Sequence, residues 1–206
     1  MVVIGLTGGI GTGKSTVSRV LAGVGATIID VALVGHEVYK PTNSTWKTLT
    51  QIFGPDILLS DDQVDRKKLG DIVFNDPAAM AQLNAIMRPE MKKILVDRLK
   101  EVSAQGEEVA VLDSATLIDA GWTSLVDEVW LVIASKKTII QRLRKRDGLS
   151  DDAINPRLSS QLTDEEQLNH ADKIIKNDGT IEELTTAVKE LWTKRIETKV
   201  RNDGAT

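Results

Sequence analysis

The sequence predicts an α/β fold, a doubly wound parallel sheet of about five strands with helices on both faces. Two observations predict it. Short runs of β-branched and aliphatic residues recur along the chain and are continuously apolar, as strands covered on both faces require. Helical patterns separate these runs, and strands that alternate with helices pair in parallel. The ligand site of such a sheet lies at the carboxyl ends of its strands.

The five runs lie at residues 2–7, 27–30, 108–113, 129–133 and, more weakly, 173–176. Between the first two, Val17, Val20, Leu21 and Val24 follow the i, i+3, i+4, i+7 spacing of an amphipathic helix. Gly25 is typical of the residue that ends such a helix.

Later helices begin at recognisable caps. Asp76 before Pro77 supplies a cap and a proline in the first helical position. Two pairs have capping-box spacing: Thr163 with Glu166, and Thr180 with Glu183. The stretch at about 42–105 holds several helical patterns and no convincing strand. We therefore expect one domain over 1–206, with a core at 1–41 and 106–200 and a helical, substrate-side insertion at about 42–105.

Composition excludes several classes of protein. The 206 residues carry 26 basic and 30 acidic side chains, a formal net charge of −4, which argues against a nucleic-acid-coating surface. There are no cysteines, which excludes disulfides and zinc–thiolate sites and suits the cytoplasm. No apolar run approaches the roughly 20 residues that span a bilayer, so we expect no membrane association. The sequence does not indicate an oligomeric state.

The strongest motif lies at residues 8–15, which fit G-x-x-x-x-G-K-[ST]. It follows the first strand and opens the first helix, as this phosphate-binding loop (P-loop) requires, and it predicts a P-loop NTPase-type fold. Glycines let backbone N–H groups surround the phosphates of ATP, and the helix N-terminus adds favourable partial charge. Lys14 would reach the β- and γ-phosphates, and the Ser15 hydroxyl would ligate Mg²⁺.

A carboxylate at a neighbouring strand end would complete the magnesium site. Asp113 ends the third run and fits this role, although a strand-end acid can also be a cap or a solvated charge. Asp30 ends the second run and is the other candidate.

A basic cluster follows the fourth run: Arg142, Arg144, Lys145 and Arg146. Arg142 and Arg146 are spaced i, i+4 and share one helix face, just before Gly148. This cluster is typical of a mobile lid that neutralises the transferred phosphoryl group, or of a solvated helix face.

The opening block at 4–17, Ile-Gly-Leu-Thr-Gly-Gly-Ile-Gly-Thr-Gly-Lys-Ser-Thr-Val, resembles that of the dephospho-coenzyme A kinase family almost residue for residue. The likeness continues in order along the chain, in segments that include Phe53-Gly54, Asp65-Arg66, Asp76-Pro77, Ala120-Gly121, Arg146-Asp147-Gly148, Arg157, Gln161 and Ala171-Asp172.

The resemblance implies a kinase with a nucleotide-binding core, a helical acceptor domain and a lid at about 142–165. It implies transfer of the ATP γ-phosphate to the 3′-hydroxyl of the acceptor's ribose, the last step of coenzyme A biosynthesis. The implied phosphate contacts are Gly9, Ile10, Gly11, Thr12, Gly13, Lys14, Ser15 and Thr16. Asn177 and Gly179 would border adenine, and Arg142 and Arg146 would belong to the lid.

Three departures from the family pattern lie on the acceptor side. The family ends its second strand with Asp-x-Asp, whose second acid is the expected general base, and this chain has Asp30-Val31-Ala32. Where the family has Asp-x-Pro-Leu-Leu-x-Glu after its third strand, this chain has Asp-Ser-Ala-Thr-Leu-Ile-Asp at residues 113–119. Where the family has a His-Pro pair before a long helix, this chain has Arg88-Pro89.

The missing base need not abolish transfer, because the transition state is loose and depends mainly on positioning and charge neutralisation. Our hypothesis is that Asp30 or Asp113 takes the role of the base, with Asp119 as a further candidate. Two other functions remain open: a paralogue acting on another hydroxyl compound, and a nucleotide-binding regulatory protein with little turnover.

Overall fold

The computed structural model describes residues 1–41, 43–159 and 161–203. Residue 42, at the start of the predicted insertion, and residue 160, in the predicted lid, lie outside this part. The chain forms two compact units, one of Met1–Ile29 with Val102–Thr206 and one of Asp30–Glu101. The second unit begins at Asp30, whereas the helical insertion was predicted to begin at about 42.

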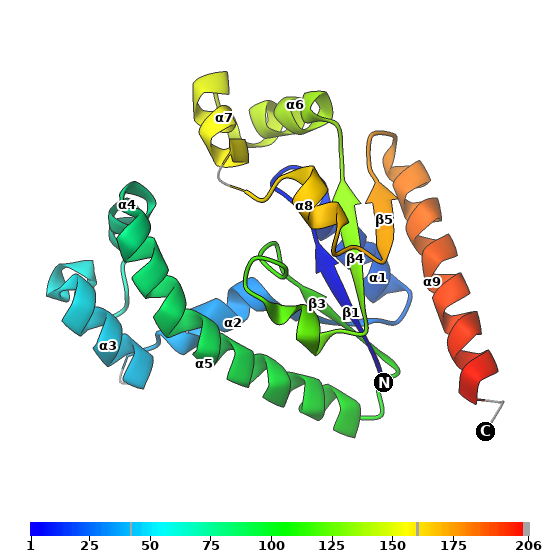
Figure 1. Ribbon diagram of the computed structural model, residues 1–206, viewed down its shortest axis with the longest axis horizontal. Coiled ribbons are helices and arrows are strands. Elements are labelled where there is room, and N and C mark those ends of the chain that lie inside the picture. The colour runs from blue at the N-terminus through cyan, green and yellow to red at the C-terminus, as the bar shows by residue number, and fades with distance from the viewer. Residues whose placement is uncertain (42, 160, 204–206) are drawn as a thin grey trace. The chain divides into compact units, whose positions relative to one another are not determined.

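The elements of Figure 1 follow in the order β1 (Val2–Thr7), α1 (Lys14–Gly23), β2 (Thr27–Asp30), α2 (Val31–Val38), α3 (Ser44–Phe53), η1 (Pro55–Ile57), α4 (Arg66–Asn75), α5 (Pro77–Ala104), β3 (Val109–Asp113), η2 (Trp122–Leu125), β4 (Glu128–Ile133), α6 (Lys136–Asp147), α7 (Asp151–Ser159), α8 (Asp164–Leu168), β5 (Lys173–Lys176) and α9 (Ile181–Asp203).

The first unit is built on a five-stranded sheet with the strand order β2-β3-β1-β4-β5, which confirms the predicted fold class. The β1–β3, β1–β4 and β4–β5 pairs are all parallel. The register places Leu6 of β1 opposite Asp113 of β3, so the P-loop and the end of β3 share the carboxyl edge of the sheet. Two predicted strands shift by one residue: β3 begins at Val109 and β4 at Glu128.

One face of the sheet packs against α1 and α9, as their apolar spacing predicts (Figure 1). Val17 and Leu21 of α1 and Leu184 and Val188 of α9 are buried in the same cluster as alternate residues of the strands. This packing fixes the start of α1, and with it Lys14, against the sheet. Each fully buried Leu or Val contributes roughly 1.5–3 kcal/mol.

The second unit is helical, as the sequence predicts. Its described residues hold α2, α3, α4 and most of α5, with one isolated bridge between Leu58 and Val64 and no longer strand. The Asp76 carboxylate accepts from the Ala78 N–H at 2.8 Å, and Pro77 takes the first position of α5, as the cap predicts. Leu49 and Ile57 are fully buried in the core of this unit.

Across the described ranges, no helix is long and apolar enough to cross a membrane.

Candidate functional site

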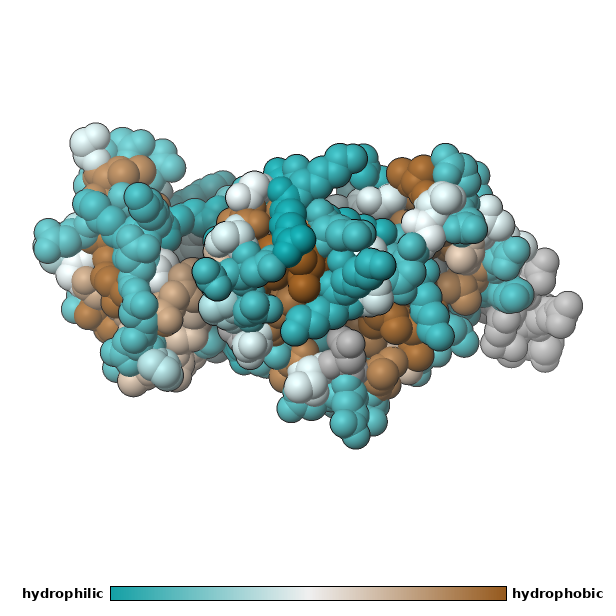
Figure 2. Space-filling view, turned by 90° about the horizontal axis from the view of Figure 1, so that it is seen from above, coloured by the Kyte–Doolittle hydropathy of each residue, from teal (hydrophilic) through white to brown (hydrophobic). Residues whose placement is uncertain are grey.

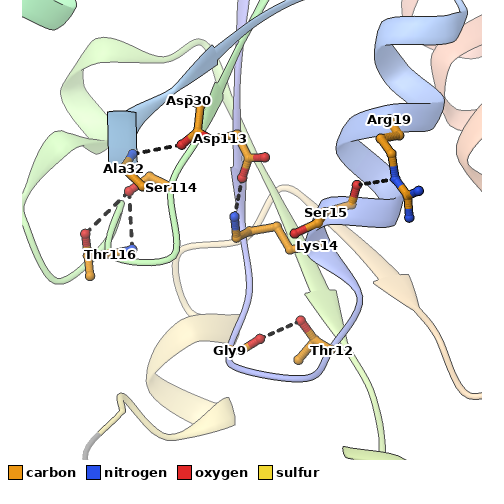
Figure 3. A network of polar contacts seen from close by, with 10 residues as sticks. All are labelled: Gly9, Thr12, Lys14, Ser15, Arg19, Asp30, Ala32, Asp113, Ser114 and Thr116. Carbon is orange, nitrogen blue, oxygen red and sulfur yellow. Dashed lines mark hydrogen bonds and ion pairs between the residues drawn. The ribbon is translucent and has the colours of Figure 1, made fainter. Parts of the chain in front are cut away.

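The loop between β1 and α1 has backbone conformations that glycine alone adopts readily. Gly13 has a φ of +97°, and a Cβ there would collide with the Asn177 Nδ2 atom. The Thr12 hydroxyl donates to the Gly9 carbonyl at 2.8 Å and closes the loop on itself (Figure 3). The Thr16 and Val17 N–H groups both donate to the Gly13 carbonyl as α1 begins. The loop is therefore held in one shape by its own chain.

Lys14 forms an ion pair with Asp113, the last residue of β3 (Figure 3). Both side chains are mostly buried, with exposed fractions of 18% and 11%. The pair forms because β3 lies beside β1, so the strand-end acid faces the start of α1. The sequence predicted both residues for one site, and the structure brings them together. A buried pair of this kind holds the lysine at the carboxyl edge of the sheet.

Arg142 and Asn177 support the P-loop from outside. The Arg142 guanidinium donates to the carbonyls of Gly11 and Thr12 at 3.3 and 3.2 Å and to the Asn177 Oδ1 at 3.1 Å. The Asn177 Nδ2 also donates to the Thr12 carbonyl, at 2.7 Å. Asn177 is only 5% exposed. We call these two side chains the loop brace; they occupy the carbonyls of Gly11 and Thr12 and hold that part of the loop in place.

Two other residues of the basic cluster on α6, Arg144 and Arg146, pair with acids. Arg146 binds its neighbour Asp147, and that hydrogen bond lowers the pKa of the Asp147 carboxyl and raises that of Arg146. The Arg144 guanidinium donates to both carboxylate oxygens of Asp151, and these hydrogen bonds lower the pKa of the Asp151 carboxyl. Figure 2 shows a mainly hydrophilic surface over α6. Although Arg142 and Arg146 are spaced i, i+4, their environments differ. Arg142 contacts the P-loop, whereas the Arg146 side chain is 64% exposed.

Asp178 follows Asn177 and holds the start of α6. Its carboxylate accepts from the Ser135 N–H at 2.8 Å and from the Thr138 hydroxyl at 2.7 Å. The backbone hydrogen bond of Ser135 is the largest cause of the lowered pKa of Asp178. The 177–179 turn thus ties the end of β5 both to the P-loop and to α6.

A hollow of about 920 Å³ lies over the P-loop. Eleven of the predicted site residues line it: Gly9, Ile10, Gly11, Gly13, Lys14, Ser15, Thr16, Arg142, Arg146, Asn177 and Gly179. Sequence reasoning missed Arg19, which also lines it, and gave Lys145 no separate role. The Arg19 guanidinium contacts the Ser15 carbonyl and the Thr16 hydroxyl, and its i+4 spacing from Ser15 was the available signal. The hollow combines a phosphate cradle with several cations.

Asp30 belongs to the second unit. Its Oδ1 accepts from the Ala32 N–H at 2.9 Å, which makes Asp30 the N-cap of α2 (Figure 3). The strand therefore ends at Asp30, and Ala32 lies in the first turn of a helix.

The donor set at the P-loop fits a magnesium ion that is held partly by phosphates. The part of the chain that the structure describes has no group of three or more His, Asp or Glu side chains suited to a metal. Mg²⁺ at nucleotide sites needs only one or two protein ligands, with phosphates and water supplying the rest. The Ser15 hydroxyl and the Asp113 carboxylate are oxygen ligands of the kind that Mg²⁺ prefers.

Comparison with known proteins decides the family. The sequence profile of the dephospho-CoA kinase family matches residues 2–183. The chain belongs to this family. A dephospho-CoA kinase of Geobacter sulfurreducens is 43% identical over 196 residues, which cover 95% of this chain and 100% of the relative.

Two solved structures are similar to this dephospho-CoA kinase family member. A crystal structure of a Thermus thermophilus protein is 28% identical with a TM-score of 0.79, covering 94% of this chain and 97% of the other. The dephospho-CoA kinase of Campylobacter jejuni has a TM-score of 0.73 at 24% identity, covers 96% and 98% of the two chains, and shows the shared fold.

Proposed function

We propose that this protein is a dephospho-CoA kinase, an enzyme that transfers the γ-phosphate of ATP to the 3′-hydroxyl of dephospho-coenzyme A. The family match carries the proposal, because it spans nearly the whole chain, and the P-loop geometry supports it. The pairing of Lys14 with Asp113 at the carboxyl edge of the sheet, where ligands of such sheets bind, is consistent with the proposal.

The chain's own residues act mainly by positioning and by neutralising charge. The N–H groups of the loop other than those of Ile10 and Thr12 bind phosphate oxygens, because the loop opens the N-terminus of α1, where N–H groups and the helix dipole favour an anion. Lys14 exchanges its pairing with Asp113 for the β- and γ-phosphates. Arg146 and Lys145, on the exposed wall of the hollow, neutralise the outer phosphates. Bound Mg²⁺ would be held by Ser15 and Asp113 and would supply neutralisation of the phosphate oxygens.

The contacts of Arg142 support a role in the phosphate cradle rather than in the moving part of a lid. Its three hydrogen bonds to the loop and to Asn177 make it part of the cradle in the described state. We propose that the moving part of the lid is α7 (Asp151–Ser159), which follows Gly148, where α6 ends in a left-handed conformation with a φ of 64°.

The acceptor and its base remain proposals. We assign acceptor binding to the helical unit at 30–101, as the family resemblance implies. Asp113, once released by Lys14, and Asp30 remain the candidate bases. Asp30 has one carboxylate oxygen engaged in capping α2, so only its other oxygen is available without loss of the cap.

The test is a coupled assay of ADP release with ATP, magnesium and dephospho-coenzyme A, beside a panel of nucleosides and small alcohols. We expect turnover with dephospho-coenzyme A and none with the panel. Lys14→Met should lower kcat/KM at least about 100-fold, because it removes a charge aimed at the transferred group. Lys137→Met is the matched control, since Lys137 is exposed on α6 and does not line the nucleotide hollow or the two smaller hollows beside it.

Turnover only with a panel compound would replace this proposal with the paralogue, and nucleotide binding without turnover would replace it with a regulatory protein. The cytoplasm stays our proposed compartment, and fractionation of the native cell with an antibody tests it.

A further inference from the structure

Gln161 lies where three hollows of the first unit meet. It lines the nucleotide hollow of about 920 Å³, and two smaller ones of about 310 and 270 Å³. Among the residues that the structure describes, Gly9 is the one other that lines all three. The 270 Å³ hollow also reaches Thr116 and Asp119, which follow β3. Gln161 therefore stands between the nucleotide hollow and the loop after β3, which carries one of the three departures from the family pattern.

The side chain of Gln161 contacts the phosphate loop directly. The Ile10 N–H donates to the Gln161 Oε1 at 3.1 Å across 151 residues of sequence. A Cβ on Gly9 would lie 2.7 Å from the same oxygen, so the glycine makes this approach possible. Within residues 1–41, 43–159 and 161–203, no hydrogen bond engages the Nε2 of Gln161.

The backbone around Gln161 is anchored to the core. The next carbonyl, that of Leu162, accepts from the Gln167 Nε2 at 2.9 Å, and Gln167 is only 8% exposed. Thr163 and Glu166 then form a complete capping box that begins α8. α8 packs on β4, the neighbour of β1 in the sheet. Gln161 is thus held at a fixed place rather than on a free arm.

We propose that Gln161 is a further catalytic residue of this kinase, one that donates hydrogen bonds to the phosphoryl group during transfer. Its only acceptor atom is occupied by Ile10, which leaves the two N–H donors of Nε2 for a ligand. Donors suit phosphoryl oxygens, whose charge spreads in the transition state. The inference rests on the proposed function for its substrate, and on the loop contact for its geometry.

The transfer itself leaves Gln161 unchanged. A bond forms between the acceptor oxygen and the γ-phosphorus, and the bond from that phosphorus to the bridging oxygen breaks. ADP leaves with the electron pair, and the proton of the hydroxyl passes to a carboxylate base. The amide gains and loses no proton, and its contribution is to donate its two N–H groups to oxygens of the moving phosphoryl group.

The test compares Gln161→Glu with Gln161→Ala. Glutamate keeps an acceptor for Ile10, removes both donors and adds a negative charge. We expect kcat to fall at least about 100-fold in Gln161→Glu and about tenfold in Gln161→Ala. By calorimetry with magnesium, Gln161→Glu should bind a non-hydrolysable ATP analogue at least about fivefold more weakly, while ADP affinity changes less than about twofold. Gln141→Glu makes the same exchange at an exposed site on α6 and should match the wild type.

Three results separate the possibilities. If kcat and the ratio of analogue to ADP affinity stay within twofold of the wild type, the proposal is wrong. If the affinities for ADP and for the analogue fall equally, Gln161 only holds the loop, which also overturns it. If the proposed function is wrong, the wild-type protein will show no turnover with dephospho-coenzyme A. The ratio of ATP-analogue affinity to ADP affinity then still tests the role of Gln161.

Discussion

Asn177→Ala tests whether the loop brace stabilises the fold. The substitution removes the hydrogen bond from Nδ2 to the Thr12 carbonyl and the one from Arg142 to Oδ1. A neutral hydrogen bond contributes about 0.5–1.5 kcal/mol, and one to a charged group about 1.5–3 kcal/mol. The two losses together should lower the free energy of unfolding by about 2–4 kcal/mol, since Asn177 is almost fully buried.

The assay is urea denaturation followed by tryptophan fluorescence, with the same protein titrated with ATP and magnesium. Asn75→Ala is the matched control. Its Nδ2 donates to the Asp71 carbonyl at the same 2.7 Å, but at an exposed helix end, so its loss should cost less than about 0.5 kcal/mol. If Asn177→Ala costs no more than this control, the brace does not stabilise the loop and the reasoning fails.

Three further predictions concern the base, the pH dependence and the core. Ala32→Asp restores the acid at the position of the family's base and should raise kcat at least about tenfold; a change under twofold would show that the base is not limiting. Asp178 has a lowered pKa, chiefly through the Ser135 N–H, so its contribution is complete above the unfolded pKa of about 3.9 and is lost as the pH falls through the folded value. The stability difference between wild type and Asp178→Asn should therefore be constant from pH 7 to 5 and shrink below about pH 4, and a difference that grows in acid would contradict this. Leu21→Ala should cost about 2–5 kcal/mol in urea denaturation because Leu21 is fully buried, whereas Leu168→Ala, 38% exposed, should cost less than half as much.

Sequence patterns predicted the local features of this fold well. Continuous apolar runs located all five strands within one residue at their starts, and helix caps such as Asp76 located helix beginnings. The motif placed Lys14 and Asp113 at one edge, because parallel strands bring their carboxyl ends together. These features depend on residues close in sequence or on the general geometry of parallel sheets.

Long-range side-chain pairings were less accessible. Asn177 lies 165 residues from Thr12 in sequence, and its contact with the loop depends on where β5 ends relative to β1. The helical spacing of Arg142 and Arg146 predicts one face, but it does not predict that Asp147 engages only the second of them. Gln161 was among the residues that resemble the family, but no local pattern predicts its contact with Ile10, which is 151 residues away in sequence.

The ion pair of Lys14 with Asp113 also couples the binding of two ligands, a polyphosphate and a divalent cation. The polyphosphate contacts the lysine, and the cation contacts the carboxylate. A polyphosphate that attracts the lysine leaves a bare carboxylate behind, and a divalent cation that takes the carboxylate leaves a bare ammonium. Each ligand therefore removes part of the cost of admitting the other. By thermodynamic reciprocity the metal must tighten nucleotide binding by the same factor that the nucleotide tightens metal binding.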